Sequence, residues 1–390
     1  MPAPASIRRL ALADLDGQTL RELAAHGEDN LVERKRQPPA PPGLGAEVAS
    51  FANTLGGWLL VGVDDDGTAV GYDKPAKTDL QSHFGDLLRA QVDPLPPYVA
   101  AWRDLDGRRI AVIRVFQSAD APHIVRGTGA LYVRSSKGKE PIDDHRTLLE
   151  LARRGEEAEE RARTRIAELP VVGHVLWTPD APAYSGPEFR DDSDARVIAR
   201  AAPVTVTPSL AAWPLTRRAA NWCTARVDQL LEQRAPYGRQ GPYPEAFARA
   251  IVVRLSQDTG GEGKDQATIV ADSGGVLGVE LRRGAFRADS PNVTLSALLD
   301  DNLIPLAATL SDMLVEAEGY GRAIVDLWLL IPPKGDIAGR RREIPRALYA
   351  SRDLTVPAGA DEVQELAHSW HRELQRAIGI IKFEGESSTG

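Results

Sequence analysis

One stretch, SFANTLGGWLLVGVDDDGTAVG at residues 50–71, constrains the fold more than any other part of the chain. The apolar residues before its double glycine follow helical spacing at Leu44, Val48, Phe51, Ala52 and Leu55. Gly56 and Gly57 are expected to end that helix, because glycine tolerates the positive φ of a helix terminus. The run WLLVGV that follows is continuously apolar, which predicts a central strand buried on both faces.

A second strand is predicted before this helix, in the alternating segment DNLVERKRQ. Glu33 and Lys35 fall on one face of it, since strand side chains repeat every two residues. Residues 31–63 therefore predict a strand, a helix and a strand, with a right-handed crossover if the strands are parallel. Asp66-Gly67 predicts a tight turn after the second strand.

The chain as a whole predicts an α+β protein, with an N-terminal mixed sheet with helices and a second α+β domain. Its 390 residues are enough for two cores. We expect an extension at 1–19, an N-terminal domain at 20–150, a charged helix and linker at 151–195, a C-terminal domain at 196–382 and a tail at 383–390. The C-terminal domain carries no chemical motif that indicates its role.

Composition excludes several classes of protein. The single cysteine, Cys223, rules out an intramolecular disulfide and a cysteine-cluster zinc site. No apolar run reaches the roughly 18 residues of a membrane helix, and the first residues lack the apolar core of a signal peptide. We therefore expect a cytoplasmic protein with no membrane partner. The absence of G-x-x-x-x-G-K-[ST] gives no support to ATP hydrolysis.

Carboxylates follow or flank both predicted strands, at Glu28, Glu33 and the run Asp64–Asp66. If the strands are neighbours, these carboxylates converge and repel one another by a few kcal/mol at about 4 Å, unless they are solvated, protonated or bridged by a divalent cation such as Mg²⁺ or Mn²⁺. The same residues are also typical of a solvated hairpin tip and of a surface pair worth about 1 kcal/mol at most. The residue types leave both interpretations open.

Basic residues of the same domain are the candidates for phosphate binding. Residues 1–150 hold 18 Lys and Arg against 21 Asp and Glu, so only segregated charges would make a basic surface. Trp102 and Tyr132 lie among these cations and would be able to stack on unpaired bases, although aromatic residues on strands are more often core. The candidate nucleic-acid-binding residues are Arg34, Arg36, Arg109, Arg134 and Lys137.

The segments EDNLVERK, FANTLGGWLLVGVDDDGTAVG and GALYVRSSKG, in this order, resemble the Schlafen-type AlbA domain. This family is also described as AAA-related or DNA-binding. The resemblance covers about residues 20–150 and says nothing about the remainder. It implies that Glu28, Glu33 and Asp65 are the carboxylates that bind Mg²⁺ or Mn²⁺ in RNA-cleaving Schlafen proteins, and that Lys35 is the family's lysine beside them. These four are the candidate catalytic residues.

The sequence departs from the family in two ways. Arg34 stands where the family usually has an aromatic or apolar residue, and no second AlbA-like lobe follows, so two copies of the chain would have to pair as a homodimer to clasp RNA. The resemblance implies a protein that binds RNA or DNA, and in its narrower form a metal-dependent endonuclease of structured RNA. The alternative is a non-catalytic regulator that binds DNA or a nucleotide and whose C-terminal domain senses or docks a partner. ATP is named as a ligand only by the family's description.

Overall fold

The computed structural model describes residues 4–72, 79–168, 171–172, 175–176, 194–231, 237–246, 249–258, 264–287, 302–330 and 347–378. Helices and mixed sheets in these residues confirm the predicted α+β class. The chain divides into two compact units. The first comprises Met1–Arg161, Val204–Ser209 and Tyr320–Arg322, and the second comprises the rest. The tail predicted at 383–390 lies outside the described residues.

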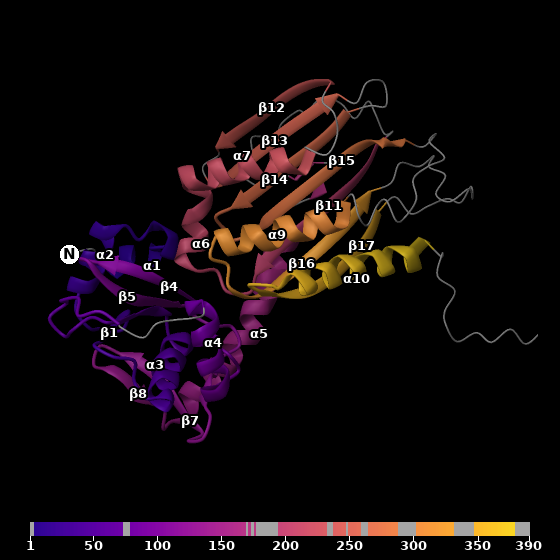
Figure 1. The fold of residues 1–390 in the computed structure, drawn as a ribbon. Coiled ribbons are helices and arrows are strands. Elements are labelled where there is room, and N and C mark those ends of the chain that lie inside the picture. Colours follow the sequence, from indigo (N-terminus) through magenta and orange to yellow (C-terminus); the bar gives the residue numbers. More distant parts are fainter. Residues whose placement is uncertain are drawn as a thin grey trace, which may run out of the picture. The chain divides into compact units, whose positions relative to one another are not determined.

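The first unit contains the segments that resemble the AlbA domain. Its elements, most of them labelled in Figure 1, are α1 (Pro4–Arg9), the 3-10 helix η1 (Leu12–Asp14), α2 (Gly17–Ala25), β1 (Val32–Lys35), α3 (Pro41–Asn53), β2 (Gly57–Val61), α4 (Leu80–Gln91), β3 (Val92–Asp93), β4 (Tyr98–Leu105), β5 (Arg108–Val115), β6 (Ile124–Val125), β7 (Ala130–Ser135), β8 (Gly138–Pro141) and the first part of α5 (His145–Glu168).

A four-stranded sheet with the order β1-β2-β5-β4 forms the centre of this unit. β1 and β2 are parallel, with Glu33 opposite Leu59 and Lys35 opposite Val61. The remaining pairs are antiparallel. The strand, helix and strand predicted over residues 31–63 are therefore present and parallel. A second small sheet has the order β3-β6-β7-β8.

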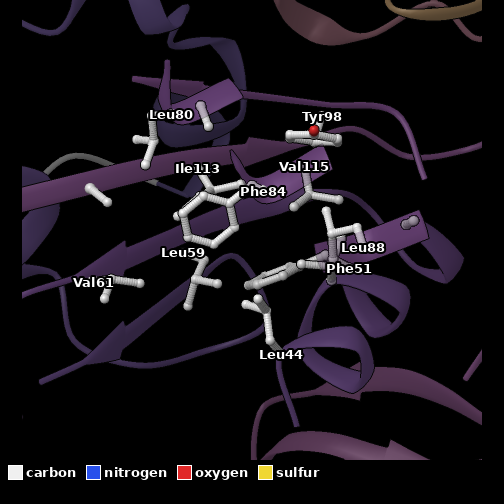
Figure 2. Packing of buried hydrophobic residues seen from close by; sticks show 14 of the residues in the cluster. Leu44, Phe51, Leu59, Val61, Leu80, Phe84, Leu88, Tyr98, Ile113 and Val115 are labelled. Carbon is white, nitrogen blue, oxygen red and sulfur yellow. The ribbon is translucent and has the colours of Figure 1, made fainter. Parts of the chain in front are cut away.

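Both faces of the central sheet are buried. Leu59 and Val61 face α3 and α4, whereas Trp58 and Leu60 alternate onto the face that packs against α1 and α2. Figure 2 shows the first of these clusters, with Leu44 and Phe51 of α3 and Leu80, Phe84 and Leu88 of α4 around the strand residues. Each large apolar side chain buried in this way contributes about 1.5–3 kcal/mol to the free energy of unfolding. Because both faces of β2 are covered, apolar residues are favoured at every position of the strand, which explains its continuous apolar sequence.

The double glycine lets β2 begin directly against α3. Gly56 has φ +72°, and a Cβ there would lie 2.6 Å from the carbonyl oxygen of Val115. A Cβ on Gly57 would overlap the ring of Phe51. The two positions therefore need glycine for different reasons, the first for backbone conformation and close approach and the second for packing.

The outer strand β4 is closed by side chains rather than by another strand. Gln81 donates to the carbonyl oxygen of Tyr98 at 3.2 Å and accepts from the amide of Ala100 at 2.7 Å. Farther along the strand, Arg103 donates to the carbonyl oxygen of Trp102 at 3.0 Å. The outward-facing backbone groups of this edge are thereby partly satisfied.

The second unit is built on a seven-stranded sheet with the order β12-β13-β14-β15-β11-β16-β17. Helices α7, α9 and α10 lie along one face of this sheet (Figure 1). None of the helices in the described parts of the chain is long and apolar enough to span a membrane. The elements are β9 (Val171–Val172), β10 (Val175–Leu176), β11 (Asp194–Pro203), α6 (Pro208–Ala212), η2 (Trp213–Leu215), α7 (Arg217–Leu231), β12 (Tyr237–Ala246), β13 (Ala250–Asp258), β14 (Lys264–Asp272), β15 (Leu277–Arg287), α9 (Ile304–Glu316), β16 (Gly321–Leu330), β17 (Ala347–Val356) and α10 (Ala360–Ile378).

Candidate functional site

Glu33 is the centre of the candidate site. It lies on β1 on the same face as Lys35, as the alternation of the strand predicts. Its side chain is 7% exposed, and its two oxygens are held by different cations, Oε1 by Lys35 and Oε2 by Arg134. Burial alone would raise the pKa of Glu33, but the hydrogen bonds from Arg134 and Lys35 outweigh it and lower the pKa below its ordinary value. Glu33 is therefore an ionised, fully engaged carboxylate.

Arg134, on β7, has a completely buried side chain. Its guanidinium donates to Glu47 Oε2 at 2.9 Å and to the carbonyl oxygen of Asp29 at 3.0 Å, as well as to Glu33. The guanidinium carbon also lies 4.1 Å from the centre of the Phe51 ring. Because this side chain is completely buried and both of its terminal nitrogens donate inside the domain, Arg134 does not face a phosphate in this arrangement, although the sequence suggested it as a phosphate contact.

Glu47, on α3, is a further member of the site and is not among the residues predicted from the sequence. Its side chain is 3% exposed, and its Oε1 is paired with Lys139 at the start of β8. A signal was present in the sequence: Glu47 is three residues after Leu44 and four before Phe51, so helical periodicity places a carboxylate on the buried face. A charge in that position needs a partner.

These contacts form a continuous ion-pair chain, which we define as Lys35–Glu33–Arg134–Glu47–Lys139. The two glutamate side chains in it are buried, whereas the lysine side chains at its ends are partly exposed, at 31% for Lys35 and 33% for Lys139. Burial would lower the pKa of Lys35, but the contact with Glu33 reverses this and raises it. Lys35 therefore stays charged at any physiological pH.

Glu28 is close to one end of the ion-pair chain. Its Oε1 lies 3.7 Å from Nζ of Lys35 and accepts the backbone N–H of Arg34 at 3.1 Å. The side chain is 40% exposed, so its charge is partly screened by water. Of the three expected metal ligands, the structure thus brings Glu28 and Glu33 together around the same lysine.

The run Asp64–Asp66 forms the turn after β2. Asp64 pairs with Arg36 at 2.5 Å, and the Oδ1 of Asp66 accepts the backbone N–H of Thr68 at 2.8 Å. Asp65 is exposed at the tip of the turn. Two of the three aspartates are therefore engaged in shaping the turn, and Asp65 is the one whose carboxylate points to solvent without a described intramolecular partner.

As placed here, the expected ligand set does not fit a divalent metal. Among the described residues, which include Glu28, Glu33 and Asp65, no group of three or more His, Cys, Asp or Glu side chains is arranged to hold one. Both oxygens of Glu33 already contact cations. Mg²⁺ and Mn²⁺ require several free oxygen ligands in a compact shell, so no chemical step is assigned to a metal.

The remaining basic candidates divide into buried and exposed residues. Arg34 is 7% exposed, points to the opposite face of the sheet from Glu33, and donates to the carbonyl oxygen of Ala24 at 3.0 Å. Arg36, Arg109 and Lys137 are exposed. Alternation along β1 explains the burial of Arg34, because it shares the face of Val32 against α2.

The Phe-Ala-Asn-Thr segment positions β7 and therefore Arg134. The buried amide of Asn53 accepts from the backbone N–H of His123 at 2.8 Å and donates to the carbonyl oxygens of His123 at 3.1 Å and Tyr132 at 2.9 Å. Thr54 Oγ1 accepts the backbone N–H of Arg134 at 2.8 Å. This segment thus joins the end of α3 to the strand that carries the central cation of the ion-pair chain.

A parallel Glu-x-Lys strand, a Phe-Ala-Asn-Thr helix and a Tyr-x-Arg strand that the helix holds in place are the features in which the first unit resembles the AlbA domain. Residues 28–143 match the family model described as Schlafen, AlbA_2, which confirms the resemblance drawn from the sequence. The match lies within the first unit.

The comparison with curated proteins gives no match. Among solved structures, the chain is similar to the DIP2311 protein from Corynebacterium diphtheriae at 20% identity and a TM-score of 0.27, over 42% of this chain and 34% of that one. It is also similar to the N-terminal domain of a Nitrosomonas europaea protein described as related to the ATP-dependent DNA helicase RecG, at 25% identity and a TM-score of 0.24, over 29% of this chain and 81% of that one. TM-scores this low support no inference about this chain.

Proposed function

We propose that the first unit binds nucleic acid, with Lys35 and Lys139 contacting the phosphate backbone. The family match at residues 28–143 supports a function related to nucleic acids. The observation that carries the proposal is the difference in exposure along the ion-pair chain. The side chains of Glu33 and Glu47 are 7% and 3% exposed, whereas the side chains of the terminal lysines, Lys35 and Lys139, are 31% and 33% exposed.

This difference determines what a ligand meets at the surface. Glu33 and Glu47 neutralise charge from within the domain, while the ammonium groups of Lys35 and Lys139 retain N–H donors for an anion. Lys137, exposed in the turn just before Lys139, adds a further cation. An ammonium is a compact charge that binds phosphate without a fixed geometry, and neutralising phosphates releases counterions whatever the base sequence.

The buried part of the ion-pair chain has a positioning role in this proposal. Arg134 holds Glu33 and Glu47 at fixed positions, and each carboxylate in turn holds one lysine. A lysine whose side chain is already ordered loses less entropy when it binds than a free one does. The lysines are therefore preorganised for an anion of fixed spacing.

The test measures binding of the full chain to a fluorescein-labelled RNA and a labelled duplex DNA over a series of salt concentrations. Lys35→Gln and Lys139→Gln should each weaken binding to every sequence and reduce the salt slope by about 1. Arg89→Ala is the matched control, because it removes one exposed cation that pairs with Asp86 on α4. If the unmodified chain binds neither probe at low salt, or if all three variants lose the same affinity, the proposal is wrong.

Metal-dependent cleavage of structured RNA stays a narrower prediction from the resemblance. The observation in its favour is that Glu28 and Glu33 converge on Lys35, the same lysine as in the family pattern. Incubating tRNA with the chain and Mn²⁺, with and without chelator, tests it: cleavage should require metal and disappear in Glu33→Gln. Binding without cleavage favours the non-catalytic regulator, and light scattering of the same samples reports whether two chains pair.

A further inference from the structure

Three side chains at the other edge of the central sheet form a stack. The rings of Tyr72 and Trp102 are 5.6 Å apart at an interplanar angle of 30°. The guanidinium carbon of Arg109 lies 4.0 Å from the centre of the Trp102 ring. This distance places the cation in contact with the ring.

The stack runs from the core to the solvent. Tyr72 is 4% exposed and belongs to the core cluster under α3 and α4, and Trp102 packs against that cluster while partly exposed. Arg109 is exposed. The outermost layer is therefore a guanidinium supported from beneath by an aromatic ring, and its outer side faces water.

Arg109 is not neutralised in the described parts of the chain, where no carboxylate comes within ion-pair distance of it. Asp104 is its cross-strand neighbour on β4, but that carboxylate accepts the backbone N–H of Gly107 at 3.0 Å. A supported cation without a counter-ion favours an anionic or electron-rich ligand over a second cation.

Arg109 and Lys35 lie on the same face and at the same end of the sheet. Lys35 is opposite Val61, which is opposite Ala111. Arg109 precedes Ala111 by two residues on β5, so its side chain lies on the same face of the sheet. Neighbouring strands are about 4.8 Å apart, so β1 and β5 are separated by about 10 Å. One extended nucleic-acid strand is long enough to reach both residues.

We infer that the Tyr72–Trp102–Arg109 stack receives an unpaired base, so that the substrate class is single-stranded nucleic acid or an unpaired loop. The inference rests on the proposed function. Unpaired bases stack on aromatic rings and on arginine planes. A base in a duplex has both faces covered by its neighbours, so it cannot extend this stack.

The experiment compares two labelled probes, a 12-nucleotide oligouridine and a 12-base-pair RNA duplex, binding to the full chain at the same low salt. Arg109→Ala should weaken binding of oligouridine about tenfold, the range of a single lost stacking contact, and change duplex binding less than threefold. Arg109→Lys keeps the charge but not the plane, so its loss for oligouridine should approach that of Arg109→Ala. Arg108→Ala is the matched control: Arg108 is the adjacent exposed arginine and alternates onto the opposite face of the sheet.

The outcomes separate the inference from the proposal on which it depends. Equal effects of Arg108→Ala and Arg109→Ala, or wild-type binding of oligouridine by Arg109→Lys, would mean that Arg109 acts only as a charge and would overturn the inference. The proposed function would survive either result. If the unmodified chain binds neither probe, the proposed function is wrong, and the inferred stacking of a base on Arg109 is wrong as well.

Discussion

Replacing Arg134 with alanine should destabilise the first unit far more than replacing any exposed arginine. The substitution leaves Glu33 and Glu47 buried at 7% and 3% exposure without the cation they share. Removing one partner of a buried ion pair costs about 3–5 kcal/mol, since the remaining charge is uncompensated. Each carboxylate keeps one lysine in the variant, so we expect a loss near the lower end of this range.

The loss should depend on pH in a way that identifies its cause. In the unmodified chain the pKa of Glu33 is below 4.5, so its favourable contribution is present above that value and is lost as the pH falls through the folded-state pKa. In Arg134→Ala, burial is no longer offset by Arg134, and the pKa of Glu33 rises. A carboxyl whose folded-state pKa is raised regains stability on protonation, so the difference between variant and parent should narrow from about pH 7 toward about pH 4.5.

Hydrogen exchange of the full chain, read in peptides from α3 and β2, measures this free energy without requiring the two units to unfold together. Arg126→Ala provides the control, because Arg126 forms an exposed pair with Asp93 and should cost less than about 1 kcal/mol. If Arg134→Ala lowers the free energy of unfolding by no more than Arg126→Ala does, the guanidinium of Arg134 is not the centre of a buried network. If the difference is independent of pH, buried carboxylates are not its cause.

Two further predictions concern the surroundings of the site. Gly57→Ala should lower the free energy of unfolding of the first unit by about 1–3 kcal/mol, since the added methyl overlaps the ring of Phe51. A Cβ at Gly17 would meet only the guanidinium end of Arg21, at 3.9 Å, so Gly17→Ala is the control. Pulse proteolysis in urea compares the two variants, and an equal loss would contradict the packing argument. Burial is the main cause that lowers the pKa of His123 below 6.5, so the contribution of this residue to stability is full above that value and should fall as the pH drops below it. Urea unfolding at about pH 7.5 and about pH 5.5 should therefore show a smaller loss of unfolding free energy in His123→Gln than in the unmodified chain. An equal loss in both would mean that other groups are responsible.

The local parts of the fold could be predicted because their patterns are strong. The helix, the double glycine and the apolar run of residues 44–61 each have one physical interpretation, and together they require a strand covered on both faces. The shared face of Glu33 and Lys35 follows from strand geometry alone. These features depend only on residues close in the sequence.

The partners of Glu33 could not be predicted in the same way. Arg134 is 101 residues from Glu33 and 87 from Glu47, and no local pattern records which strand lies against which helix. The sequence therefore predicts a phosphate-binding cation at Arg134 and not the buried partner of Glu33. The charged neighbours of Arg34 likewise indicate a surface residue, whereas on a strand covered on both faces each of two adjacent side chains points to a buried face.

The side-chain hydrogen bonds along the outer edge of β4 limit how this chain can associate with another. Adding a strand to an existing sheet needs a row of free amide and carbonyl groups, and on β4 the side chains of Gln81 and Arg103 occupy such groups at Tyr98, Ala100 and Trp102. A second chain that approached this border would have to displace three hydrogen bonds before it formed its own. Two copies that clasp one nucleic acid are therefore not expected to pair edge to edge along β4.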